Sequence, residues 1–309
     1  MKPTVFIDGE AGTTGLQIRT RLAQRADLNI LALGESERKS ASARSEAINS
    51  CDFAILCLPD EAAREAVSLV KNPSVRIIDA SSAHRNHPEW VYGFAEMSDD
   101  QQNKIRAASR VSNPGCYPTG AIAILRPLID RKVVPPGYPV VVQAISGYSG
   151  GGRQVIEMYE DRENPDYTEA PVLGYGLSLE HKHIAEMETQ SGLSGRPIFV
   201  PLRGNFRQGI LLLVGFHHGL IGADSGDRIR SALVKHYQEK PFVRVADEAE
   251  ARSSETLDAQ TLNGTDELVL HVFSNESRGQ TVVAAIYDNL GKGASGAAVQ
   301  NLDLMLTGR

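Results

Sequence analysis

Over the first 115 residues, short apolar runs typical of buried strands are separated by segments whose apolar residues recur at helical spacing. The strand runs are Thr4–Asp8, Leu28–Leu33, Phe53–Leu58 and Val75–Ala80, and helical spacing is found in Leu16–Arg25 and Glu61–Val70. This β-α-β order predicts a Rossmann-type doubly wound parallel sheet. Such a sheet binds its ligand at the carboxyl ends of the strands.

The pattern changes after residue 115, where extended runs become longer and helical segments fewer. Helical spacing covers residues 116–130, Ser225–Glu239 and Gly293–Leu306. The strand candidates are Pro139–Ile145, Ile198–Pro201, Gln208–His218, Phe242–Val245, Leu268–Ser274 and Thr281–Ile286. Long strands with few helices predict a mixed sheet covered on one face, which is an α+β domain.

Composition narrows the choice of partners and compartment. The 309 residues are 41% hydrophobic and 23% charged, a balance typical of soluble globular proteins, and the net charge is −6. This acidic balance argues against a nucleic acid or an anionic membrane surface as the main partner. The start of the chain lacks a signal-peptide core, and no apolar run approaches about 18 residues, so we expect a cytoplasmic protein.

Cysteine usage points to a nucleophile. None of the three cysteines is in Cys-x-x-Cys spacing, which argues against disulfides and zinc, and Cys51 and Cys57 border or lie in an apolar run typical of a buried structural role. Cys116 instead follows a Pro114-Gly115 break and precedes apolar residues at helical spacing. A thiol at a helix N-terminus ionises more readily, and the thiolate attacks acyl carbons.

The first strand is followed by the glycine-rich loop Gly9-Glu10-Ala11-Gly12-Thr13-Thr14-Gly15. The glycines allow a tight turn and a close approach of the backbone to a pyrophosphate at the helix N-terminus, although an ordinary strand-to-helix turn is the alternative. After the second strand, Ser36, Arg38 and Lys39 could hold the 2′-phosphate of NADP. Because Glu35 and Glu37 lie among them, a solvated charged loop is the competing interpretation.

A second glycine-rich segment, Ser146–Arg153, follows the strand that ends at Ile145. Successive N–H groups of such a turn can form an anion-binding concavity, and Arg153 adds a positive charge. We expect Ser149 and Gly150 to bind the cofactor. The alternative is a flexible hairpin loop.

Two histidines beside a lysine, His181 and His183, are the best candidates for proton transfer to or from a thiol nucleophile. His217 and His218 lie in an apolar strand and are interpreted as structural, with one side chain pointing inward and one outward. His84 and His87, in a loop after the fourth strand, are weaker candidates.

Five segments together resemble the short form of the N-acetyl-gamma-glutamyl-phosphate reductases: Gly9–Gly15, Asn113–Thr119, Ser146–Arg153, His181–Glu186 and Lys292–Asn301. The resemblance covers nearly the whole chain, and the segments around Cys116 and after Lys292 are the specific ones. It implies the fold of the aspartate-semialdehyde dehydrogenase superfamily, with a catalytic and dimerisation domain like that of glyceraldehyde-phosphate dehydrogenase. The implied domains are an NADP-binding domain of residues 1–115 with 292–309, and a catalytic and oligomerisation domain of residues 116–291.

The resemblance also implies residue roles. Cys116 matches the nucleophile, His181 the acid/base and His183 a neighbour that lines the site, while Arg207 matches an arginine assigned to the substrate phosphate. We expect Asn113 and Arg153 to contact substrate as well. The implied partners are NADPH, a small-molecule acyl phosphate and further copies of the chain in a dimer or tetramer.

The expected chemistry is attack of Cys116 on the acyl phosphate, release of phosphate, and hydride transfer from NADPH to the thioester. A related reductase of aspartyl or aminoadipyl phosphate is one alternative. A non-catalytic dinucleotide-binding sensor with a structural cysteine is another.

Overall fold

The computed structural model describes residues 2–247, 249–250 and 256–308, and these residues divide into two compact units. Unit 1 comprises residues 1–95, 100–115 and 294–309, and unit 2 comprises residues 96–99 and 116–293. The chain therefore changes unit between Gly115 and Cys116 and again between Gly293 and Ala294.

Unit 1 is built on a six-stranded sheet in the order β2-β1-β3-β4-β6-β5, and every pair of neighbouring strands is parallel. The strands are β1 (Thr4–Asp8), β2 (Asn29–Leu31), β3 (Phe53–Leu56), β4 (Arg76–Asp79), β5 (Val91–Tyr92) and β6 (Arg110–Ser112). The helices are α1 (Thr13–Leu22), α2 (Ala41–Ser50), α3 (Asp60–Ser68), α4 (Gln101–Ala107) and α10 (Gly296–Thr307).

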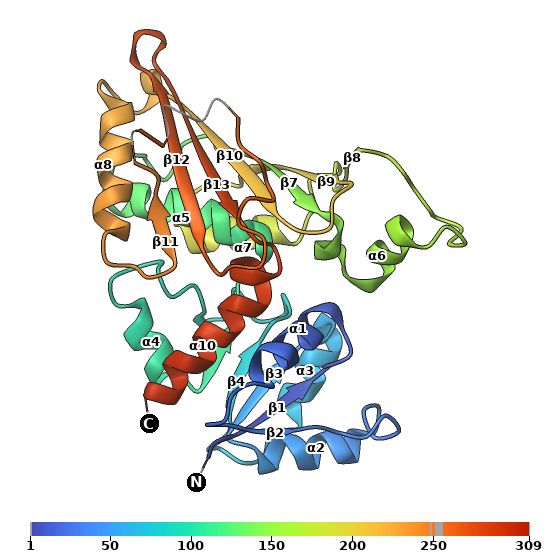
Figure 1. Ribbon diagram of the computed structural model, residues 1–309. Coiled ribbons are helices and arrows are strands. Elements are labelled where there is room, and N and C mark those ends of the chain that lie inside the picture. Colours follow the sequence, from blue (N-terminus) through green and yellow to red (C-terminus); the bar gives the residue numbers. More distant parts are fainter. Residues whose placement is uncertain (1, 248, 251–255, 309) are drawn as a thin grey trace. The chain divides into compact units, whose positions relative to one another are not determined.

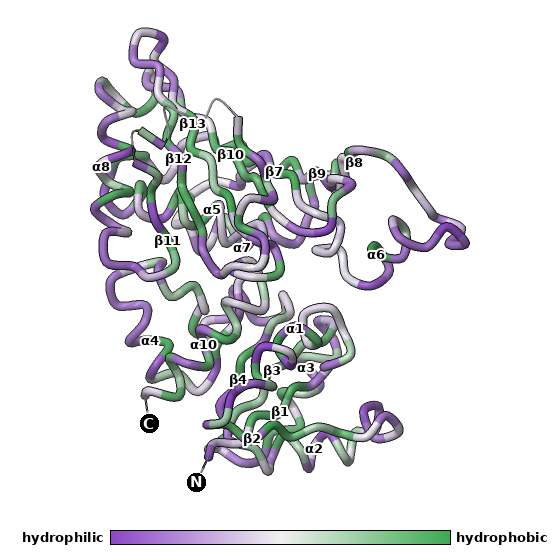
Figure 2. Tube along the Cα trace, in the orientation of Figure 1, coloured by the Kyte–Doolittle hydropathy of each residue, from purple (hydrophilic) through white to green (hydrophobic). Residues whose placement is uncertain are grey.

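Alternate residues of β1, β2, β3 and β4 face two different hydrophobic cores, because successive side chains of a strand point to opposite faces. Val5 and Ile7 of β1 pack with residues of α1, α4 and α10, whereas Phe6 packs with residues of α2 and α3. Both faces are therefore covered by helices, and the predicted doubly wound parallel sheet is confirmed. In the tube of Figure 2, β1 and β3 are largely hydrophobic along their length, as expected for strands buried on both faces.

Unit 2 holds a seven-stranded mixed sheet in the order β11-β12-β13-β10-β7-β9-β8. Its strands are β7 (Val141–Gly147), β8 (Val172–Gly174), β9 (Ile198–Gly204), β10 (Ile210–His217), β11 (Val243–Val245), β12 (Leu268–Asn275) and β13 (Gln280–Tyr287). The pairs β11/β12 and β7/β9 are parallel and the others antiparallel. The predicted α+β character is thus confirmed.

Helices α5 (Cys116–Asp130), α7 (His183–Ser191) and α8 (Ser225–Tyr237) gather on one side of this sheet in Figure 1. Helix α5 contacts the strands β10 and β13, and α8 contacts β11, β12 and β13. The buried residues Val142, Val214 and Val283 are partners across three neighbouring strands and mark the covered face. Helix α6 (Gly152–Glu160) follows the short 3₁₀ turn η1 (Tyr148–Gly151) after β7.

Several sequence-based boundaries need correction. Thr13, Thr14 and Gly15 belong to the first turn of α1, because the glycine-rich turn already ends at Gly12. Residues 148–153 form η1 and the start of α6, not a flexible hairpin loop. The helices α2, α4, α6 and α7 and the short strands β5, β6 and β8 were not predicted, because most of their segments are polar or very short.

Candidate active site

Cys116 is the first residue of α5 and is half-buried. The first N–H groups of a helix have no partner within it, so the N-terminus of α5 stabilises a negative charge on the thiol. The other two cysteines differ, because burial raises the pKa of Cys51 and of Cys57 to about 12. Cys116 is therefore the thiol of this chain that is suited to act as a nucleophile.

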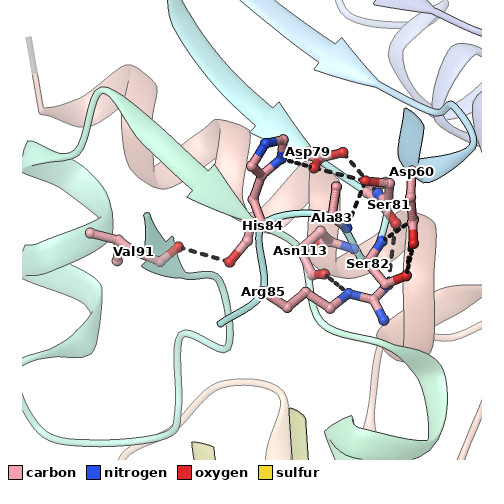
Figure 3. A network of polar contacts seen from close by, with 11 residues as sticks. Asp60, Asp79, Ser81, Ser82, Ala83, His84, Arg85, Val91 and Asn113 are labelled. Atoms are coloured by element: carbon pink, nitrogen blue, oxygen red, sulfur yellow. Dashed lines mark hydrogen bonds and ion pairs between the residues drawn. The ribbon is translucent and has the colours of Figure 1, made fainter. Parts of the chain in front are cut away.

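The segment that precedes Cys116 is fixed by a buried polar network in unit 1, shown in Figure 3. The Asp79 carboxylate accepts hydrogen bonds from the Ser81 N–H (2.9 Å) and the Ser81 hydroxyl (2.8 Å), and lies 2.6 Å from His84 Nδ1. The Asp79 carbonyl accepts from the N–H of Asn113 (2.7 Å), and the Asn113 carbonyl accepts from Arg85 Nε (3.0 Å). These bonds fix the position of the chain just before Pro114. His84 takes part in them, which indicates a structural role for this histidine.

The Asn113 side chain takes part in the same network. Its Nδ2 donates to the Ala294 carbonyl and its Oδ1 accepts from Asn301 Nδ2, each at 3.0 Å. Asn113 is 1% exposed, so its amide joins the segment before Cys116 to α10. These contacts favour a structural role over the expected contact with substrate.

His181 lies in an aromatic cluster next to the nucleophile. Its ring contacts those of Tyr117 (centroids 6.4 Å apart), Tyr175 (5.8 Å), His183 (4.7 Å) and Phe199 (5.3 Å). Tyr117 directly follows Cys116, so the fold brings the two predicted histidines to the turn of α5 that carries the thiol. Burial, and secondarily the Lys182 charge, lower the pKa of His181 to about 4.

One backbone contact selects the tautomer of His181. The N–H of His183 donates to Nδ1 of His181 at 3.2 Å. Because Nδ1 accepts, the proton of the neutral ring resides on Nε2. Near neutral pH, His181 is therefore an uncharged hydrogen-bond donor through Nε2, suited to polarise an acyl oxygen.

The two arginines expected to contact substrate are both paired on the surface. Arg153, in the first turn of α6, is exposed and bonds Glu157 at 2.8 Å. Arg207 is exposed and forms an ion pair with Glu160. Ser149 and Gly150 lie in unit 2, where the buried Ser149 hydroxyl accepts from Asn289 Nδ2 (3.0 Å).

A cavity of about 480 Å³ opens in unit 1 at the carboxyl ends of β1 and β3. Its lining includes Gly9, Ala11, Gly12, Arg38, Lys39 and Cys57. Gly9 has φ +88°, and a Cβ on Gly9 or on Gly15 would lie 2.3 Å from a backbone oxygen, so both positions require glycine. Gly12 caps α1 without a side-chain hydrogen bond, which leaves the first N–H groups of the helix for an anion.

Charges around this cavity fit a dinucleotide with a 2′-phosphate. Arg38 and Lys39 line it, although Arg38 also bonds the buried Glu10 carboxylate at 2.7 Å. Glu37 turns back on its own loop and accepts from the Gly34 N–H (3.0 Å). Ser36 is exposed in this turn and is not among the residues that line the cavity.

Within the described part of the chain, no cluster of three or more residues could hold a metal ion. Among the described helices, none combines the length and the apolar character needed to cross a membrane.

Comparison with known proteins shows the family of this chain. Semialdehyde dehydrogenase models match both parts of the chain, the NAD binding domain over residues 4–105 and the dimerisation domain over residues 116–289. The aspartate semialdehyde dehydrogenase II of Vibrio cholerae shares the fold with a TM-score of 0.73 and 16% identity, covering 99% of each chain.

Two relatives are much closer in sequence. The N-acetyl-gamma-glutamyl-phosphate reductase of Burkholderia cenocepacia is 54% identical over 98% of this chain and 97% of its own length. That of Brucella ovis is 51% identical over 99% of each chain. The chain thus belongs to the semialdehyde dehydrogenase family and, within it, to the N-acetyl-gamma-glutamyl-phosphate reductases.

The tautomer and low pKa of His181 can be tested by NMR on protein with labelled histidine. We expect titration near pH 4 and a neutral ring protonated on Nε2 between pH 6 and 8. Lys182→Gln should raise the pKa of His181 only slightly, because burial is the larger cause of its lowering. A pKa near the usual 6.5 of a free histidine would contradict this assignment.

Proposed function

We propose that the chain reduces N-acetyl-γ-glutamyl phosphate with NADPH to N-acetylglutamate semialdehyde and phosphate, a step of arginine biosynthesis. The observation that carries the proposal is Cys116 at the N-terminus of α5, with the His181 ring against Tyr117 beside it. The names of relatives more than 50% identical over nearly the whole chain support the choice of substrate.

In the proposed mechanism, the Cys116 thiolate attacks the acyl carbon, the bond from that carbon to the phosphate oxygen breaks, and phosphate leaves with the electron pair. NADPH, when bound, supplies a hydride for the resulting thioester. The Nε2–H of His181 stabilises the negative oxygen during both additions, and His183 lines the same site. Cleavage of the carbon–sulfur bond then releases the semialdehyde and regenerates the thiolate.

We further infer that residues 1–115 with 292–309 bind NADP and that residues 116–291 provide catalysis and self-association. The cavity at the carboxyl ends of β1 and β3, with its glycines and basic residues, supports the first assignment. The described part of unit 1 includes α10 from the end of the chain, whose Ala298, Leu302 and Met305 are fully buried in its core. A cytoplasmic location remains part of this proposal.

An assay of NADPH oxidation against three acyl phosphates tests the substrate. We expect turnover of N-acetyl-γ-glutamyl phosphate at least about 10²-fold more efficient than that of aspartyl or aminoadipyl phosphate. Cys116→Ser should abolish turnover while NADPH binding persists, and His181→Asn should lower kcat roughly 10²- to 10³-fold, the range for loss of one donor to the oxyanion. A preference for aspartyl phosphate would refute the proposal, and activity above a few per cent in Cys116→Ser would exclude the nucleophile.

Cofactor choice depends, in this proposal, on the two basic residues at the cavity. Replacement of both Arg38 and Lys39 by alanine should weaken NADPH binding about 10-fold or more and change NADH binding little, because NADPH alone carries the 2′-phosphate. Lys104→Ala, a surface charge of α4 in the same unit, serves as control. Equal losses for both cofactors would show that the two charges are merely solvated.

We also propose that unit 2 self-associates through the sheet face opposite α5 and α8. Val141, Ile198 and Val282, on three strands, are 38%, 49% and 39% exposed there, and the matched family model is described as a dimerisation domain. In sedimentation velocity, the double variant Ile198→Asp/Val282→Asp should be a monomer, whereas the wild type and Leu16→Asp, a substitution on α1, should sediment as a dimer or tetramer. A monomeric wild type would refute this proposal.

A further inference from the structure

One arginine that contacts the aromatic cluster around His181 was not among the residues that the sequence analysis proposed for the site. Arg203 lies in β9, where it is the partner of Ser146 in β7 and of Leu173 in β8. Successive side chains of a strand alternate between faces, so Phe199 and Arg203 share one face. Phe199 contacts Tyr117 and His181 on this face, with ring centroids 5.1 and 5.3 Å apart. Arg203 is therefore on the side of the sheet that carries the nucleophile.

A tyrosine connects Arg203 to the residue next to Cys116. The Arg203 guanidinium lies 4.7 Å from the ring centroid of Tyr175. The Tyr175 hydroxyl donates to that of Tyr117 at 3.1 Å, and the Tyr117 hydroxyl donates to the Leu202 carbonyl at 3.1 Å. Burial raises the pKa of Tyr175 to about 12, while the hydrogen bond with Tyr117 and the Arg203 charge oppose the rise. One phenol thus contacts both Arg203 and the tyrosine that follows the nucleophile.

The polar contacts of Arg203 differ from those of three other arginines of unit 2. Arg153, Arg196 and Arg207 each pair with a glutamate. Arg203 is half-buried, and within the described residues its guanidinium makes the contact with Tyr175 but no hydrogen bond or ion pair. A half-buried guanidinium with free N–H groups offers a fork that matches the two oxygens of a carboxylate.

We infer that Arg203 binds the α-carboxylate of the substrate and so selects an N-acylated amino acid over an uncharged acyl chain. This inference rests on the proposed function, whose substrate carries two anionic groups. The phosphate is attached to the carbon that Cys116 attacks, whereas the carboxylate is separated from that carbon by three others. One tyrosine ring separates Arg203 from the residue beside the nucleophile, which fits the more distant anion.

The reverse reaction distinguishes the two anions, because semialdehyde and phosphate are then separate substrates. For Arg203→Gln we expect an increase of about 10- to 10²-fold in KM for N-acetylglutamate semialdehyde and an unchanged KM for phosphate. Arg203→Lys, which keeps the charge but loses the fork, should give an intermediate value. An increase in KM for phosphate alone would overturn the inference in favour of a phosphate contact.

A substrate without the carboxylate completes the test. The wild type should use 4-acetamidobutanal about 10- to 10²-fold less efficiently than the semialdehyde, and Arg203→Gln should no longer distinguish the two aldehydes. If Arg203→Gln keeps the wild-type preference, the inference is wrong.

Controls separate this inference from the proposed function and from misfolding. Arg162→Gln, an exposed arginine of the same unit, should behave as wild type. The melting temperature and NADPH affinity of Arg203→Gln should match those of the wild type, whereas a collapse of both would mean that Arg203 is structural. If the wild type does not use the semialdehyde, the proposed function is wrong, independently of the results for the Arg203 variants.

Discussion

The geometry of the nucleophile depends on one buried hydroxyl. Tyr287, at the end of β13, is fully buried; its hydroxyl donates to the Cys116 carbonyl at 2.7 Å and accepts from the Gly120 N–H at 3.3 Å. In a regular α-helix the Gly120 N–H would donate directly to the Cys116 carbonyl. Here the Tyr287 hydroxyl lies between these two groups and connects the first turn of α5 to the sheet. Gly120 leaves the space for this contact, because a Cβ there would lie 2.7 Å from Tyr287. Burial also raises the pKa of Tyr287 well above its usual range, which keeps it a donor.

A buried ion pair stabilises the turn that lies next to Cys116. Lys292 Nζ lies 2.7 Å from the Glu96 carboxylate, and the two side chains are 1% and 0% exposed. Lys292 belongs to the π-helical turn η4 (Gly291–Ser295), in which a Cβ on Gly293 would come within 3.2 Å of Cys116 Cβ. Loss of one partner of such a pair costs about 3–5 kcal/mol, because the other charge remains buried. π-Helical turns are often found at functional sites, and this one touches the nucleophile.

The sequence was most informative where one physical preference dominates. Apolar runs identified β1, β3 and β10, and the Pro114-Gly115 break identified the start of α5, because both signals are local. The helix α2 was missed because its stability comes from the few residues that it buries against the sheet, Ala47 and Ile48 among them. The pairing of Arg153 with Glu157 is an i, i+4 contact that would have been predicted had the helix α6 been predicted, whereas the pairing of Arg207 with Glu160 could not be predicted. For Arg207 that pairing brings together residues 47 positions apart. Alternation along β9 could have pointed to Arg203, since it places that residue on the face of Phe199.

The contrast among the three thiols has a practical consequence. Cys51 and Cys57 remain protonated at physiological pH, because burial raises the pKa of each to about 12. Cys57 is partly accessible, as Cys116 is, but of the three only Cys116 begins a helix. Peroxide and alkylating reagents attack thiolates, so oxidative damage should concentrate on a single sulfur atom per chain. The stoichiometry of inactivation would then count active sites directly, and bound substrate or cofactor would be seen as protection of that one sulfur.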